Sequence, residues 1–153
     1  MTNDLALDRQ VCFALYAASR AMTSVYRPML DELGLTYPQY LVLLVLWERD
    51  GRGVGELGDE LALDSGTLSP LLKRLSALGL VERKRLSADE RRVAIHLTDQ
   101  GRALQAKASG IPHRIARCSG LPVSEIENLR ETLVQLTNSL NSKTEFQNQG
   151  DDR

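Results

Sequence analysis

Aromatic residues, cysteine, histidine and long hydrophobic runs are all scarce in this sequence. Aromatic residues make up only 5% of the chain. No apolar run approaches the roughly 18 residues of a membrane span. The first ten residues, MTNDLALDRQ, carry acidic side chains and lack the basic region of a signal peptide. We therefore expect a cytoplasmic protein that does not engage a membrane.

The few cysteines and histidines do not form a recognisable metal site. Cys12 and Cys118 lie far apart and lack CxxC spacing, which excludes a zinc site and a disulfide framework. His96 and His113 are isolated in the sequence, and each is expected at the surface or at its boundary. The sequence therefore predicts neither a metal ion nor a cofactor.

The composition favours one helical domain without an overall positive charge. The chain has 153 residues, a length typical of a single domain, and Leu, Ala, Glu and Arg favour helices over sheets. The formal net charge is -1 and the pI is about 6.1. A nucleic-acid site, if present, must therefore be a local patch.

Residues 61–80 have the clearest amphipathic pattern in the sequence. Leucines at three- and four-residue steps predict one apolar helical stripe, formed by Leu68, Leu71, Leu72, Leu75 and Leu78. The opposite face carries small hydroxyls followed by cations, namely Ser65, Thr67, Ser69, Lys73 and Arg74. Such a face suits a DNA groove, where hydroxyls reach bases or phosphates and cations offset phosphate charge. An ordinary solvated helix face is the alternative.

The preceding residues predict a helix-turn-helix. Thr36 to Gln39 has the form of a capping box and opens a helix, and residues 50–53 form a turn. A short helix over 54–61 comes next, and Asp64 is the expected N-cap of the helix that follows. Pro70 lies either in a late first turn of that helix or at a bend.

After Gly79 the period changes to that of strands. Residues 81–85 and 92–97 predict two strands, with Val93, Ile95 and Leu97 on one face, and residues 87–90 form the turn between them. This hairpin holds a dense group of cations: Arg83, Lys84, Arg85, Arg91 and Arg92. A charge run alone is usually a solvated face. Next to a helix-turn-helix, it indicates a wing that enters a minor groove.

Both ends of the chain predict helices with a narrow apolar seam. In residues 8–33 the seam comprises Leu15, Ala18, Met22, Val25 and Met29, with a kink or a join of two helices expected at Pro28. A helix from Thr98 toward Arg117 is broken or bent at 110–112. In the last helix the seam comprises Ile126, Leu129, Leu133, Leu136 and Leu140.

This order of elements predicts a mainly α, winged helix-turn-helix domain. We expect residues 8–34 and 98–141 to form a two-fold dimer interface, residues 36–97 the DNA-binding core, and residues 142–153 a disordered tail. The two winged units of such a homodimer would meet the two half-sites of a palindromic operator in double-stranded DNA.

The thiol of Cys12 has two interpretations. A lone cysteine is most often a small buried hydrophobe, and Tyr26 and Tyr37 are most often core aromatics. If tyrosine hydroxyls do stabilise a Cys12 thiolate, Tyr26 of the same helix is too far away. It follows Cys12 by about four turns, or about 20 Å at roughly 1.5 Å per residue. The donors would then come from the partner subunit.

Three segments carry a family resemblance. They read CFALYAASRAMTSVYRPMLDELGLTYPQYLVLLVLWE (12–48), LDSGTLSPLLKRL (63–75) and GLVERKRLSADERRVAIHLTDQG (79–101). With these residues the chain resembles the MarR family of winged-helix repressors, and within it the OhrR branch, which senses organic hydroperoxides. The resemblance covers nearly all of residues 8–121. The first segment is the most specific part.

The resemblance implies a redox role for both cysteines. Cys12 would be the peroxide-reactive thiolate, with Tyr26 and Tyr37 as hydrogen-bonding partners across the dimer. Cys118 occupies the kind of position where two-cysteine members keep a resolving thiol. An organic hydroperoxide would oxidise Cys12 to a sulfenic acid, and Cys118 of the other subunit would trap it as a disulfide.

The resemblance also implies roles in the wing. Asp89 would structure the wing and Arg91 would lie at its tip. Leu86 departs from the pattern, because a polar residue is more usual there.

Three other functions stay open at this point. A repressor gated by a small aromatic ligand would leave both cysteines inert. A thiol peroxidase would turn over hydroperoxide, although no catalytic constellation favours an enzyme. An interaction module would not bind DNA at all.

Overall fold

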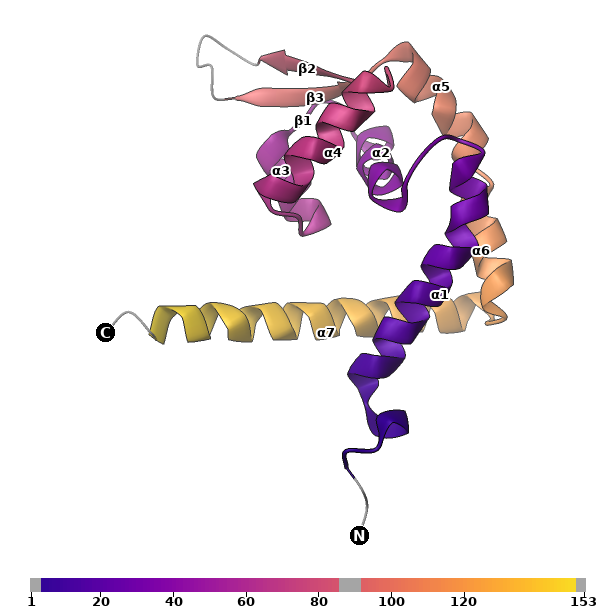
Figure 1. Ribbon diagram of the computed structural model, residues 1–153, viewed down its shortest axis with the longest axis vertical. Coiled ribbons are helices and arrows are strands. Elements are labelled where there is room, and N and C mark those ends of the chain that lie inside the picture. The colour runs from indigo at the N-terminus through magenta and orange to yellow at the C-terminus, as the bar shows by residue number, and fades with distance from the viewer. Residues whose placement is uncertain (1–3, 86–91, 151–153) are drawn as a thin grey trace. The chain divides into compact units, whose positions relative to one another are not determined.

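The structure, a computed structural model, describes residues 4–85 and 92–150, without the side chains of 145–150 (Figure 1). Within these ranges the elements are η1 (Leu7–Arg9), α1 (Val11–Asp31), α2 (Tyr37–Glu48), β1 (Arg52–Gly53), α3 (Val54–Leu61), α4 (Ser65–Ala77), β2 (Val81–Arg85), β3 (Val93–Leu97), α5 (Asp99–Ala108), α6 (Ile111–Ser119) and α7 (Val123–Gly150). The predicted fold class, mainly helical with a winged helix-turn-helix, is confirmed.

The chain divides into two compact units. The first ends at Ile111 and holds η1 to α5 with all three strands, and the second begins at Pro112 and holds most of α6 and all of α7. Among the described residues, no helix is both long and apolar enough to cross a membrane.

Helix α2 is the centre of the first unit. Its capping box is formed as predicted, with Thr36 Oγ1 accepting from the Gln39 backbone and Gln39 Oε1 accepting from the Thr36 backbone. Its sequence is apolar on nearly every side, as expected for a helix packed from several directions. It contacts α1, α3, α4, α5 and β3, and its buried side chains are Gln39, Tyr40, Val42, Leu43, Val45 and Leu46.

The helix-turn-helix consists of α3 and α4, which contact each other and α2. Ala62 ends α3 with a left-handed backbone, at φ 53°. Leu68, Leu71, Leu72 and Leu75 of α4 are buried, as the stripe predicts. The stripe also includes Leu78, but this side chain is 45% exposed. The reason is that α4 ends at Ala77, so Leu78 is the C-cap residue and the chain turns away at Gly79, with φ 73°.

A three-stranded antiparallel sheet follows, with the order β1-β3-β2. Strand β2 pairs with β3 in the register Val81↔Leu97, Arg83↔Ile95 and Arg85↔Val93. The prediction that residues 50–53 form only a turn is wrong, because Arg52 and Gly53 pair with Ile95 and Ala94 as β1. Both Ala94 and Ile95 are buried although successive side chains of a strand point to opposite faces, so the expected alternation of β3 is incomplete.

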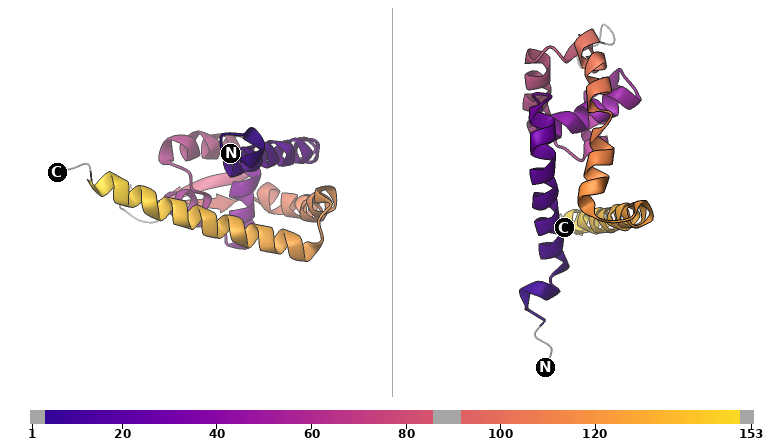
Figure 2. Two further views of the ribbon diagram at one scale, coloured as in Figure 1. Left: turned by 90° about the horizontal axis from the view of Figure 1, so that it is seen from below. Right: turned by 90° about the vertical axis from the view of Figure 1, so that its right-hand side faces the viewer.

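The structure bears on three expectations for the terminal helices. Of the kink or join expected at Pro28, the join is excluded, because α1 is one continuous helix (Figure 2, right). The predicted disordered tail over 142–153 is wrong in part, because α7 runs past Asn141 to Gly150. Neither Gly nor Pro occurs between Ser142 and Gln149 to end the helix. The predicted break near residues 110–112 is confirmed, since α5 ends at Ala108 and α6 begins at Ile111.

Candidate nucleic-acid interface and thiol sites

The outer face of α4 is open to solvent along its length. The Asp64 carboxylate accepts from the Thr67 backbone N–H at 2.8 Å and fixes the start of the helix, as predicted. The leucines pack inward, so the polar residues of the helix point away from the core. All five residues predicted to face DNA are exposed: Ser65, Thr67, Ser69, Lys73 and Arg74.

Pro70 lies inside α4 and is exposed. It is the sixth residue of the helix, beyond the first turn, where its missing N–H removes the hydrogen bond to the Gly66 carbonyl. In a helix interior, proline costs on the order of 3 kcal/mol relative to alanine. Because the ring is exposed, it gains little burial to offset this cost.

The wing strands present cations to solvent. Arg83 and Arg85 of β2 and Arg92, which precedes β3, are all exposed. The Lys84 ammonium, on the same strand, lies 2.9 Å from the Glu82 carboxylate. A hydrogen bond from Lys84, and then its charge, lower the pKa of Glu82. The predicted wing residues Asp89 and Arg91, like Leu86, lie outside the described residues.

Two of these arginines share one hollow at the base of the wing. Arg83 and Arg92 line a hollow of about 660 Å³ together with Val93 and the residues around the start of α3. Glycines 51, 53 and 55 form much of that wall. Glu56 also lines this hollow, so its wall carries one acidic residue as well as the two arginines.

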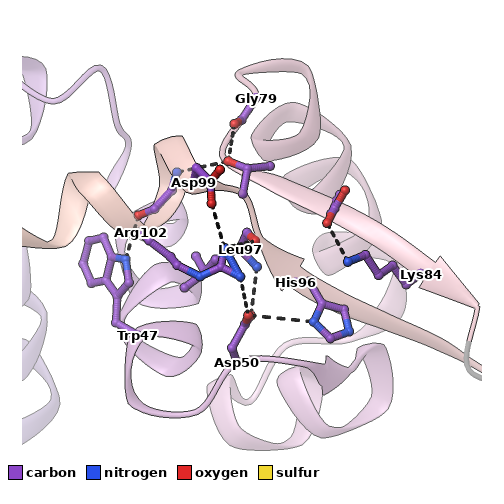
Figure 3. A network of polar contacts seen from close by, with 11 residues as sticks. Trp47, Asp50, Gly79, Lys84, His96, Leu97, Asp99 and Arg102 are labelled. Carbon is purple, nitrogen blue, oxygen red and sulfur yellow. Dashed lines mark hydrogen bonds and ion pairs between the residues drawn. The ribbon is translucent and has the colours of Figure 1, made fainter.

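The base of the wing is tied to the body of the first unit by Asp50 (Figure 3). Its Oδ1 accepts from the Leu97 backbone N–H at 2.8 Å, and its Oδ2 lies 3.5 Å from Arg102 Nη2 and 3.8 Å from His96 Nδ1. The sequence assigned Asp50 only to a turn. Its partners are 46 to 52 residues further along the chain, so no local pattern identifies it.

A second group of contacts joins the end of α4, β3 and α5. Thr98 Oγ1 donates to the Gly79 carbonyl at 2.6 Å and accepts from the Gly101 N–H at 3.0 Å. The indole of Trp47 donates to the Gly101 carbonyl at 2.9 Å. A Cβ at Gly101 would lie 2.1 Å from the Leu80 carbonyl oxygen, so only glycine fits there.

Both cysteines are free thiols on exposed residues. Cys12 is the second residue of α1, and its exposure argues against the buried-hydrophobe interpretation. Cys118 lies in α6, in the second unit.

The structure brings Tyr26 and Tyr37 together. Their ring centroids are 4.9 Å apart, and Tyr40 lies 6.0 Å from Tyr26 and 6.4 Å from Tyr37. Burial, with Tyr37 and Tyr40 nearby, raises the pKa of Tyr26 to about 12. Its hydroxyl therefore keeps its proton near neutral pH and can donate it to an acceptor. Sequence reasoning missed Tyr40, which is 2% exposed and gives the other two rings a rigid support.

A smaller hollow lies beside Tyr37. Its volume is about 280 Å³, and its walls come from the C-terminal half of α1 and the start of α2. Thr23, Arg27 and Asp31 supply its polar side chains, and Leu30 and Leu35 contribute apolar surface. In the described part of the chain, no group of three or more His, Cys, Asp or Glu side chains is arranged to hold a metal ion.

The chain is similar to regulators of transcription. Residues 24–107 match the family model of the transcriptional regulator SarA/Rot. The HTH-type transcriptional regulator TtmR of Methylorubrum extorquens (strain PA1) is 49% identical over 90% of this chain and 71% of its own length. The organic hydroperoxide resistance transcriptional regulator of Bacillus subtilis (strain 168) is 47% identical over 91% of this chain and 95% of its own length.

Solved structures of AbfR from Staphylococcus epidermidis are similar in fold and sequence. Reduced AbfR bound to DNA is 40% identical, with a TM-score of 0.74 over 88% of this chain and 94% of that one. Disulfide-formed AbfR is 39% identical, with a TM-score of 0.63 over 86% of this chain and 92% of that one.

Proposed function

Because the chain belongs to the SarA/Rot and MarR-type winged-helix transcriptional regulators, we propose that it is a redox-sensing repressor. Its reduced homodimer binds a palindromic operator in double-stranded DNA, in the cytoplasm, and oxidation of Cys12 by an organic hydroperoxide releases it. The observation that carries this proposal is an exposed thiol on α1, in a chain that has a pair of tyrosine rings in contact where α1 meets α2.

The DNA-binding part of the proposal rests on α4 and the wing. Helix α4 lies in the major groove with Ser65, Thr67 and Ser69 near the bases, while Lys73 and Arg74 bind phosphates. Arg83, Arg85 and Arg92 of the wing, with Arg91 at its tip and Asp89 structuring the turn, bind along the minor groove. The exposure of α4 and the shared hollow of Arg83 and Arg92 support this arrangement. Reduced AbfR was solved bound to DNA.

The dimer is supported by apolar side chains that a single chain leaves exposed. On α1 these are Val11, Phe13, Tyr16 and Met22, and on α7 they are Val123, Leu129, Val134 and Leu140. Burying such residues between two copies is favourable by about 25 cal/mol per Å² of apolar surface. In the proposed dimer, Tyr26 and Tyr37 of one subunit donate hydrogen bonds to the Cys12 thiolate of the other.

The proposed redox step transfers one oxygen atom from the hydroperoxide to Cys12. The Cys12 thiolate attacks the outer oxygen of the hydroperoxide, the O–O bond breaks, and the alkoxide leaves and takes up a proton to become an alcohol. Cys12 is thereby oxidised to a sulfenic acid. The Cys118 thiolate of the partner then attacks that sulfur, an S–S bond forms, and hydroxide leaves as water.

The link to DNA runs through α2. Tyr26 of α1 packs on Tyr37 and Tyr40 of α2, and α2 in turn packs on α4. Two cysteines form a disulfide only when their Cα atoms come within about 7 Å. Moving α1 to meet that limit changes its packing on α2, re-angles the two α4 helices, and lowers operator affinity.

Non-reducing gel electrophoresis tests the disulfide. After one equivalent of cumene hydroperoxide per chain, we expect a covalent dimer from the wild-type protein and none from Cys118→Ser. A covalent dimer from Cys118→Ser would contradict the pairing of Cys12 with Cys118. Consumption of many equivalents without added thiol would instead indicate a peroxidase.

The hollow beside Tyr37 favours one rival, a repressor gated by a small aromatic ligand. Its size, and the Arg27 guanidinium in its wall, suit a phenolic acid. In that case a phenolic acid would release the operator, hydroperoxide would not, and both cysteines would be dispensable.

A further inference from the structure

The middle of the outer face of α4 carries an apolar ring, Pro70, as well as polar residues. Gly66, Pro70, Lys73 and Ala77 follow one another at steps of four, three and four residues. This spacing puts them on one face of the helix, opposite the buried leucines. All four are exposed, and Pro70 is the bulkiest apolar group among them.

Pro70 breaks a local rule without a gain in packing. It removes one hydrogen bond from α4, its ring is exposed, and alanine at this position would favour the helix. A residue that breaks a local rule without a compensating gain is a candidate for a functional role. An exposed proline in the middle of a DNA-facing helix therefore points to a contact that the ring makes with the DNA.

We propose that the Pro70 ring is a specificity-determining group that contacts the C5 methyl of a thymine in each operator half-site. This inference rests on the proposed function, because it requires α4 to lie in a major groove. The ring has neither donor nor acceptor, and the thymine methyl is the apolar feature of the major-groove edge. Ser69 and Lys73 flank the ring and supply the polar contacts beside it. Gly66, one turn earlier, has no side chain to keep the base edge away.

The experiment removes the methyl group alone. A duplex is selected from a random palindromic library with the reduced wild-type dimer, and each thymine is then replaced by deoxyuridine. We expect one symmetric position at which the wild type loses affinity by about fourfold per half-site, or about 15-fold for both, as for burial of one methyl-sized group. Pro70→Ala should bind the thymine and uracil duplexes equally at this position.

A stability measurement and a matched control complete the test. Pro70→Ala should raise the melting temperature while it loses the discrimination, which a purely structural proline would not do. Pro28→Ala removes an exposed proline from the interior of α1 and should discriminate as the wild type does.

Two results would overturn the inference. One is Pro70→Ala retaining the wild-type preference for thymine, and the other is a wild-type protein indifferent to uracil at every position. In both, the protein still binds the duplex, so the proposed function survives. Failure to select any duplex would overturn the proposed function as well.

Discussion

Tyr26 and Tyr37 are the side chains on which the proposed thiol chemistry depends most. They are packed ring to ring on the buried Tyr40, so their hydroxyls are held in place before any partner thiol arrives. Burial raises the pKa of Tyr26 to about 12, so its hydroxyl stays protonated near neutral pH and can donate a hydrogen bond. A fixed, neutral donor suits an anionic acceptor such as a thiolate.

Removing these hydroxyls should slow oxidation of Cys12. A hydrogen bond to a charged group contributes about 1.5–3 kcal/mol, and we expect Tyr26→Phe or Tyr37→Phe to lower the rate by roughly tenfold or more. The rate is measured as loss of free thiol after addition of cumene hydroperoxide to Cys118→Ser protein. Tyr40→Phe is the control, since Tyr40 is buried and its hydroxyl should not reach a partner thiol. Equal rates in all three variants would contradict the tyrosine role.

The free energy of unfolding should be sensitive to substitution of Gly101. Gly101→Ala puts a Cβ 2.1 Å from the Leu80 carbonyl oxygen, which is backbone and cannot easily move. We expect a loss of about 1–3 kcal/mol in the free energy of unfolding, the range for overpacking. Urea unfolding measures it. Gly55→Ala, another helical glycine but with nothing within 4 Å of its Cβ, should be neutral or stabilising, and a similar loss in both variants would contradict this account.

Among the elements, α4 and the wing carry the proposed contacts to DNA, and their cations differ in what they can contribute. Arg83 and Arg92 line one hollow, whereas Lys84 is already paired with Glu82. Protein–DNA affinity falls with salt in proportion to the number of phosphates that cations neutralise.

The salt dependence of operator binding should therefore separate these residues. For Arg83→Ala and Arg92→Ala we expect weaker binding, and a plot of log affinity against log salt that is shallower by about 0.9 for each phosphate that the variant no longer neutralises. Lys84→Ala should change this slope less. Fluorescence anisotropy between about 50 and 200 mM salt provides the measurement. If the slope of log affinity against log salt is unchanged in both arginine variants, Arg83 and Arg92 do not bind phosphates.

Local sequence patterns predicted most elements, because caps and apolar periodicity act over a few residues. The α4 stripe, its Asp64 cap and the capping box at Thr36 are examples. The sequence did not predict strand β1 or the contacts of Asp50, because these depend on residues far away in the sequence. Arg52 is part of a strand only because Ile95 pairs with it, and Asp50 is an anchor only because Leu97 and Arg102 reach it. Pro70 is irregular in the sequence alone, but its exposure at the centre of the α4 face required the structure.

In the proposed dimer as a whole, sensing and DNA binding lie on different parts of each subunit. Cys12 is on α1, and Tyr26 and Tyr37 lie where α1 contacts α2. Helix α2 in turn packs on α4, the helix proposed to bind the major groove. The seams predicted on α1 and α7 leave Met22, Leu129 and Leu140 exposed in a single chain. We propose that this interface couples oxidation of Cys12 in one subunit to the DNA contacts of both.

A gel-shift assay on DNA upstream of the gene for this protein tests that coupling most directly. Reduced wild type and Cys12→Ser should both bind. One equivalent of cumene hydroperoxide per chain should release the wild type and not Cys12→Ser, and dithiothreitol should restore wild-type binding. Equal release of Cys12→Ser, or a wild-type complex that resists the hydroperoxide, would contradict the proposed sensor.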